Sequence, residues 1–244
     1  MLQKDTSKWP MVVCETAEDI PAGGLKIVRP EIVQQLGNTV DAMFPAFAAA
    51  FPQCAAAMKE HWSKPKLVVA PVGLDWIASV VLEGTGAKNI QIKHGWVLAE
   101  VDGPEFEEYK AMLPVAWKEL YRWFDSFGLT DYPFNGDWIN TPFNYASRLA
   151  PERYRQLIGG KKTDVRDFEK RFDSIKLRCW LLTDASDTLW LDEQRCDHKV
   201  YHLRGGNFKD VGVLANPAQA LDTYLAHVLS GGKPADFDFY KWRV

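Results

Sequence analysis

The residue pattern changes abruptly near residue 65, and this change limits the choice of fold more than any other part of the sequence. Residues 31–62 are rich in Ala, Met and Phe, and their apolar residues recur every three or four positions, which is the helical period. Pro45 and Pro52 interrupt the pattern, so we expect two helices there. Residues 66–101 instead contain β-rich runs separated by glycines, as in an antiparallel sheet. The sequence therefore predicts an α+β fold.

Shorter patterns complete this prediction along the rest of the chain. Helical spacing predicts a helix over residues 105–127, where most of the apolar residues are aromatic, and another over residues 217–229. Residues 131–145 contain Pro and Gly and are expected to be loop-rich. Apolar runs bounded by turn residues predict strands at residues 11–14, 25–28, 175–180 and 198–202, and an alternating edge strand at 237–242.

The order of these elements indicates two related units. Two consecutive glycines and two lysines at residues 159–162 mark an exposed turn or linker, which divides the chain into units 1–160 and 161–244, with one single domain as the alternative. Residues 95–140 and 198–243 share the order strand, glycine turn, helix and aromatic strand. We therefore expect pseudo-duplicated strand-helix-strand units that share one mostly antiparallel sheet.

Composition excludes several classes of partner. The 29 Lys and Arg residues against 32 Asp and Glu give a net charge of −3, and no cluster of cations suits nucleic acid. The most apolar stretch, residues 43–58, falls short of the roughly 20 residues that span a bilayer, so no membrane partner is expected. The first residues lack the apolar core of a signal peptide, which favours a cytoplasmic protein. The four cysteines are scattered, as expected of reduced thiols without disulfides.

One central region resembles a known family. Residues 94–104 read as a strand that ends in a Gly103-Pro104 turn, and residues 116–123 follow the pattern Ala-Trp-x-x-Leu-Tyr-x-Trp. Gly128-Leu129 and the aromatic-x-Asn-x-Pro pattern of residues 138–142 come next. Over residues 66–145 this order resembles the GyrI-like small-molecule-binding domain, named after the gyrase inhibitory protein.

The resemblance implies a pseudo-twofold fold in which one curved, mostly antiparallel sheet, with helices packed on one face, forms a concave, aromatic-lined cleft. Members bind drug-like or cationic small molecules, and a few relatives hydrolyse reactive cyclopropane compounds. The family often carries a Glu two residues before the aromatic residue of the closing strand, but that position is Gly136 here. Asp137 is adjacent to it, and in the C-terminal unit the same spacing from Tyr240 gives Asp238. The missing acid weakens the inference of cation binding.

Ten tryptophans are the strongest independent indication of a ligand cleft. Indole rings offer large apolar faces that suit flat or cationic ligands, although most aromatic residues at helical spacing belong to a core. Strand positions make Trp96, Trp138 and Trp180 the best cleft candidates. The full set of expected ligand-binding residues is Trp96, Trp138, Trp180, Tyr109, Trp117, Asp137 and Asp238.

One acid is a candidate for catalysis. Glu100 shares a strand face with Trp96 and follows an apolar run, a setting that favours general acid or base chemistry, or it simply faces solvent. Cys196, His198 and His202 would share one strand face, but neighbouring positions on it lie ~7 Å apart, too far for one ion, so no metal is predicted. No nucleophile elbow or phosphate-binding loop is present, and no cofactor is predicted.

These observations favour a soluble protein that binds a hydrophobic or cationic aromatic small molecule in an aromatic-lined cleft. One alternative is a hydrolase on the same scaffold, which acts on a reactive hydrophobic metabolite with Glu100 as general base. Another is a protein-interaction or immunity-type protein whose exposed aromatic residues bind a partner. A homodimer stays open.

Overall fold

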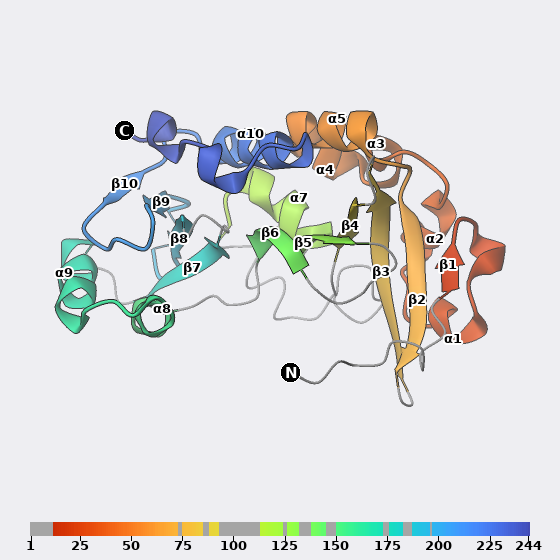
Figure 1. The fold of residues 1–244 in the computed structure, drawn as a ribbon, viewed down its shortest axis with the longest axis horizontal. Helices are drawn as coiled ribbons and strands as arrows, with labels where there is room; N and C mark the ends of the chain where they lie inside the picture. The colour runs from red at the N-terminus through yellow and green to blue at the C-terminus, as the bar shows by residue number, and fades with distance from the viewer. Residues whose placement is uncertain are drawn as a thin grey trace.

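The chain forms two antiparallel β-sheets with helices around them, as a computed structural model shows (Figure 1). The structure describes residues 12–72, 75–84, 88–92, 113–123, 126–131, 138–144, 150–172, 176–182, 187–195 and 197–244. The predicted α+β class and the antiparallel pairing are confirmed. The strands after residue 160 pair with one another in a sheet of their own instead of extending the first sheet.

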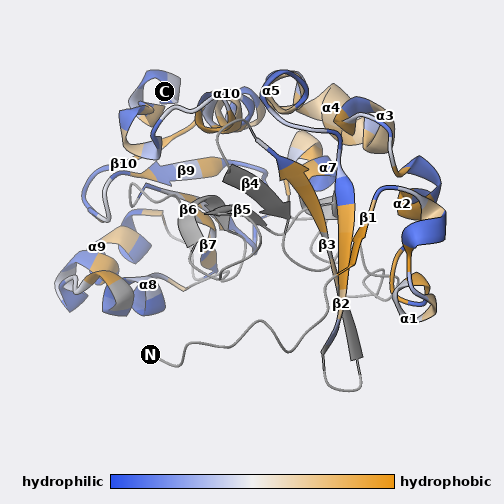
Figure 2. Cartoon of the chain, turned by 45° about the vertical axis from the view of Figure 1, so that its right-hand side comes forward, coloured by the Kyte–Doolittle hydropathy of each residue, from blue (hydrophilic) through white to orange (hydrophobic). Residues whose placement is uncertain are grey.

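Among the described residues the first sheet has six strands in chain order, each antiparallel to its neighbour. Val69 pairs with Val12 on one side and with Ala78 on the other, so β2 lies between β1 and β3. The described parts of β2 and β3 are mostly hydrophobic in Figure 2, as expected of strands that face a core. The strands are β1 Val12–Cys14, β2 Lys66–Val72, β3 Asp75–Glu83, β4 Lys88–Ile92, β5 Ser126–Asp131 and β6 Trp138–Asn144.

Prolines set the boundaries of the N-terminal helices. Pro45 and Pro52 are the first residues of α4 and α5, a position at which the backbone N–H has no partner within the helix, so its absence costs no hydrogen bond. The region therefore forms several short helices instead of the two expected. The predicted strand at 25–28 is wrong, because Leu25 closes one helical turn through its bond to Pro21. The helices are α1 Ala22–Leu25, α2 Pro30–Gln35, α3 Val40–Met43, α4 Pro45–Ala50 and α5 Pro52–His61.

The predicted helix over 105–127 extends too far at its C-terminal end. The helix α7 spans Val115–Trp123, and residues 105–112 lie outside the described residues. Phe127 pairs with Ile92 in the sheet, so strand pairing prevails over helical spacing at this end. The strand β6 occupies part of the region expected to be loop-rich.

The second sheet has the order β10-β9-β8-β7. Its strands are β7 Leu177–Leu182, β8 Thr188–Asp192, β9 Val200–Leu203 and β10 Val211–Val213. The helices α8 Pro151–Ile158 and α9 Lys162–Phe172 precede it, joined by a turn in which Gly159 adopts a left-handed conformation. The helix α10 spans Pro217–Leu229, as predicted. The predicted edge strand at 237–242 is wrong, because Phe239–Trp242 forms a 3-10 helix, η4.

One large core joins the two sheets. It contains residues from β1, from the helices α2 to α5, from β2, β3 and α7, and from β7, β8, β9 and α10. A second, smaller core lies between the four-stranded sheet and the helices α8 and α9. Both halves of the chain therefore contribute to one continuous apolar interior.

The helices α5 and α10 lie side by side in Figure 1, and hydrogen bonds join both ends of α5 to α10. Asp222 of α10 is 3% exposed, and its two carboxylate oxygens accept hydrogen bonds from the backbone amides of Cys54 at 2.8 Å and Gln53 at 3.1 Å. Trp62, which follows α5, donates its indole N–H to Leu229 O at 2.8 Å. The pKa of Asp222 is raised because burial removes water from the carboxylate, against the opposing effect of the two amides.

The end of the chain docks onto the outer strands of the second sheet. Ala215 N donates to Trp242 O at 2.8 Å, and Val244 N donates to Val213 O at 3.0 Å. The guanidinium of Arg243 donates to Asp210 Oδ1 at 2.7 Å and to the carbonyl oxygens of His202 and Asp210 at 3.2 Å. Burial alone would raise the pKa of Asp210, but its bonds to Arg243 and Tyr240 hold it below the usual value.

The Asp222 contact predicts a measurable stability loss in an isosteric variant. In Asp222→Asn only one oxygen remains to accept a hydrogen bond, and the new amide group faces a backbone N–H. We expect the free energy of unfolding to fall by about 1–2 kcal/mol in urea denaturation. Thr223→Ala is the control, because it removes two exposed bonds, one from the Gln53 side chain and one to Gln219 O within α10, and it should cost less than about 0.5 kcal/mol. Equal losses of unfolding free energy in the two variants would show that the bonds from Asp222 to the start of α5 contribute no more than the Thr223 contacts.

A second prediction concerns Gly212, over which the Arg243 side chain lies. A Cβ atom at Gly212 would come within 2.6 Å of Arg243 Cδ, so Gly212→Ala must displace the arginine. We expect a loss of about 1–3 kcal/mol in the free energy of unfolding, because a partly buried network of charged hydrogen bonds is broken. In an Arg243→Ala background the same substitution should cost much less. A double-mutant cycle measures this difference, and additive costs would show that the arginine is not displaced.

Candidate functional site

The structure places two of the predicted ligand-binding residues in the large core. Trp117 on α7 is 0% exposed and Trp180 on β7 is 1% exposed. Trp117 donates its indole N–H to Pro217 O at 3.3 Å, at the start of α10. Both rings therefore contribute to the apolar packing that joins the two sheets.

The remaining predicted residues lie elsewhere or outside the described residues. Trp138 is the first residue of β6 and pairs with Thr130. Asp238 is exposed and accepts a hydrogen bond from Tyr240 N at 3.0 Å, which caps η4. Trp96, Glu100, Tyr109 and Asp137 are outside the described residues, and their roles stay predictions.

A cluster of aromatic rings supports α8 and α9 on the second sheet. Phe168 of α9 packs edge-on against Trp190 of β8 at 5.7 Å and against Phe208 at 5.3 Å between ring centroids. Tyr154 of α8 packs edge-on against Trp190 at 5.5 Å. This geometry is favourable for aromatic pairs, so the rings fix both helices on the sheet. We call it the aromatic cluster, and its members are Tyr154, Phe168, Phe172, Trp190, Tyr201 and Phe208.

A groove of about 320 Å³ lies between α8 and α9. Its lining comes from the first turn of α8 and from one side of α9, where the residues recur at helical spacing. Val165 is buried and also belongs to the small core, so the groove has an apolar floor. The lining residues are Glu152, Lys162, Val165, Arg166 and Glu169.

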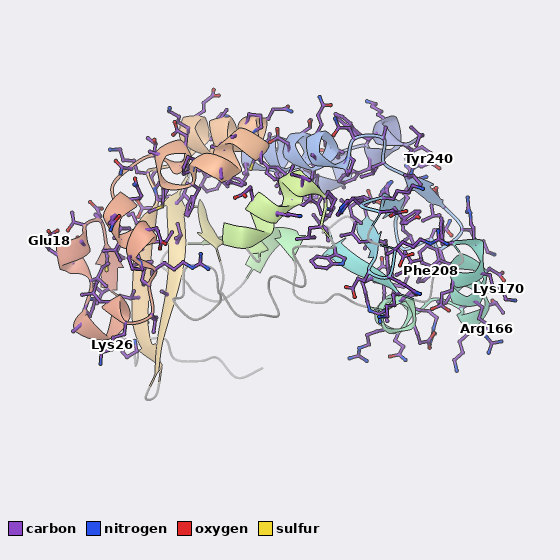
Figure 3. All side chains as sticks on the ribbon, turned by 180° about the vertical axis from the view of Figure 1, so that it is seen from behind. Glu18, Lys26, Arg166, Lys170, Phe208 and Tyr240 are labelled. Atoms are coloured by element: carbon purple, nitrogen blue, oxygen red, sulfur yellow. The ribbon has the colours of Figure 1, made fainter. Side chains whose placement is uncertain are left out.

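The charges of the groove are not evenly balanced. Glu152 accepts two hydrogen bonds from the Arg155 guanidinium, at 2.9 Å and 2.6 Å, and this contact holds the pKa of Glu152 below its usual value. In the described part of the chain no ion pair engages Lys162 or Arg166. Figure 3 shows Arg166 and Lys170 on the outer side of α9, away from Phe208. The groove therefore has two exposed cations and two carboxylates, of which Glu152 is paired with Arg155 and is also attracted by Lys162.

The sequence did not indicate these residues as a site. Lys161 and Lys162 suggested an exposed turn, whereas Lys162 is the first residue of α9. The spacing of Val165 and Phe168 is a signal for this helix, and positions 162, 166 and 169 then fall along one side of it. Which charges face a groove depends on the packing of α8, which no local pattern reveals.

The cysteines and histidines form no reactive group among the described residues. Cys14, Cys54 and Cys179 are buried free thiols, and burial raises the pKa of each, that of Cys14 to about 11. His198 is exposed, whereas His202 is buried. No group of three potential metal ligands occurs in the described ranges, and Cys196 lies outside them.

The comparisons with other proteins add no assignment. Among the described residues no helix has the length and apolar character needed to cross a bilayer. No family model, no curated protein and no solved structure matches this chain. The likeness to the GyrI-like domain stays a prediction from the sequence.

Proposed function

We propose that this protein binds a small molecule that carries an anionic group, in the groove between α8 and α9. The observation that supports the proposal is the pair of accessible cations, Lys162 and Arg166, above the apolar floor formed by Val165. A guanidinium and an ammonium group are the usual protein partners of carboxylates, sulfonates and phosphates.

The size of the groove favours a compact ligand. A volume of about 320 Å³ is near the lower end of the range of small-molecule pockets, roughly 300–1,000 Å³. Val165 is only 3% exposed, so the charged side chains provide most of the surface that a ligand would contact. The supporting aromatic cluster fixes α9 on the sheet, so the charged side chains extend from a rigid backbone, and binding has to order only the side chains.

The order of charges along α9 sets the orientation of the ligand. From residue 162 to residue 169 the helix rises about 10 Å, with the two cations first and the carboxylate of Glu169 last. Since Arg155 already neutralises Glu152, the remaining lining charges sum to about +1. An anionic group therefore belongs near Lys162 and Arg166, and a cationic group, if the ligand has one, near Glu169.

The cleft implied by the GyrI-like resemblance is a second hypothesis. It requires duplicated strand-helix-strand units with Trp96, Tyr109 and Asp137 around a hydrophobic or cationic aromatic ligand, and Glu100 as base in the hydrolase alternative. These four residues lie outside the described residues. Only the groove between α8 and α9 requires an anionic ligand, which makes the two hypotheses separable by experiment.

Two fluorescent probes of opposite charge test the proposal. We expect the anionic dye 8-anilinonaphthalene-1-sulfonate to bind the native protein and to increase its emission, with binding weakened as salt is raised. In Lys162→Ala and Arg166→Ala the dissociation constant should increase about fivefold, because each loses a contact worth about 1 kcal/mol. Titration at constant ionic strength measures the constant.

Lys170→Ala is the matched control for this experiment. Lys170 lies on the same helix and is exposed, but it does not line the groove. Its removal changes the net charge by the same amount and should leave the dissociation constant nearly unchanged. Equal increases of the dissociation constant in all three variants would show that the dye responds to net charge in general, and would contradict binding in the groove. Saturable binding of the cationic dye thioflavin T alone, unaffected by any of the variants, would favour the aromatic cleft instead.

A further inference from the structure

A buried histidine lies at the centre of the polar network that holds the end of the chain. His202 of β9 is 1% exposed, and its Nδ1 is 3.0 Å from Nε of Arg243. An arginine can only donate, so Nδ1 must carry a lone pair in this contact. The single proton of the ring is then on Nε2, and the docked arrangement requires a neutral imidazole.

The opposite side of the ring faces a carboxylate. His202 Nε2 is 3.5 Å from Asp187 Oδ1, and among the described residues it makes no hydrogen bond. The same oxygen of Asp187 accepts a bond from Gly205 N at 2.8 Å. The ring of Phe239 lies 5.1 Å from the imidazole and helps to exclude water. Asp187 is therefore in position to stabilise an imidazolium ion without displacing β9.

A second proton on His202 would oppose the arginine directly. It would add an N–H on Nδ1 that faces the Nε–H of Arg243 at a separation of 3.0 Å, so two donors and two positive charges would meet. Asp210 Oδ1 bonds to Arg243 and to the hydroxyl of Tyr240, each at 2.7 Å, and among the described residues no hydrogen bond joins Asp210 to the imidazole. Arg204 stacks on Tyr240 at 5.1 Å and adds a further cation to this side.

We propose that His202 is a proton-operated latch for residues 240–244. The neutral ring accepts the Arg243 bond and holds the segment on β10, whereas the protonated ring pairs with Asp187 and releases Arg243. Phe239 is 2% exposed and part of the large core, so the segment detaches beyond this anchor and not before it. Release removes the bonds of Val213 and Ala215 to the chain end and exposes the outer edge of β10.

Amide hydrogen exchange at two pH values tests the latch. After correction for intrinsic rates, the protection of the Val244 and Ala215 amides should fall at least about tenfold from pH 7.5 to pH 5.5. The amides in the middle of α10 serve as the internal reference for global unfolding and should keep their protection. In His202→Asn the amide oxygen replaces Nδ1 as the acceptor and does not titrate, so protection should be the same at both pH values.

His198→Asn is the matched control, since this histidine is exposed and Asn tolerates its left-handed backbone conformation, with φ of 58°. It should respond to pH as the wild type does. Unchanged protection of Val244 and Ala215 in the wild type would overturn the proposal, as would a parallel loss throughout α10. A pH response that persists in His202→Asn would also overturn it. Should that variant fail to fold, Arg243→Gln replaces it, with low protection of the chain end expected at both pH values.

Discussion

The buried carboxylate of Asp222 is the contact on which the junction between the two halves of the molecule depends. The start of α5 cannot satisfy its own amides, because Phe51 has no polar side chain and Pro52 has no amide hydrogen. The next two N–H groups, of Gln53 and Cys54, are both bonded to Asp222 from α10. A helix near the start of the chain is thus completed by one near its end. Since an unsatisfied buried amide costs about 1–3 kcal/mol, this arrangement favours one relative position of α5 and α10.

The end of the chain is held by a different kind of interaction. Beyond the anchor at Phe239, the last residues depend on the charge-assisted bonds of Arg243 and on a few backbone bonds to Val213 and Ala215. Gly212 provides the space for the arginine side chain, which no larger residue could do. This segment also covers the outer edge of β10, and coverage of an edge strand prevents pairing with other chains.

Local signals located most of the elements, and contacts that form only in the folded chain decided several of their types and boundaries. The helix α10 was predicted at its exact bounds because Asn216 caps it, Pro217 opens it and its apolar residues keep the helical period. Phe239–Trp242 alternates like a strand but forms a 3-10 helix, since Asp238 caps it and the ring of Phe239 inserts into the core. Contacts between elements also explain why the sequence did not reveal the candidate site. The buried positions of Trp117 and Trp180 and the groove on α9 follow from packing between elements, which no residue pattern encodes locally.

The turn of residues 207–210 contacts both α9 and the end of the chain. The strength of these contacts decides whether detachment of the chain end would move α9 and its groove. Asp210 at the end of the turn bonds Arg243, Lys209 forms an ion pair with Asp164 of α9 at 3.3 Å, and Phe208 inserts into the aromatic cluster. The ion pair is exposed on the lysine side and contributes about 0–1 kcal/mol. Burial of a phenylalanine contributes about 1.5–3 kcal/mol, and Phe208 is 4% exposed. The position of the turn is therefore set by Phe208, so detachment of the chain end leaves α9 and its groove in place.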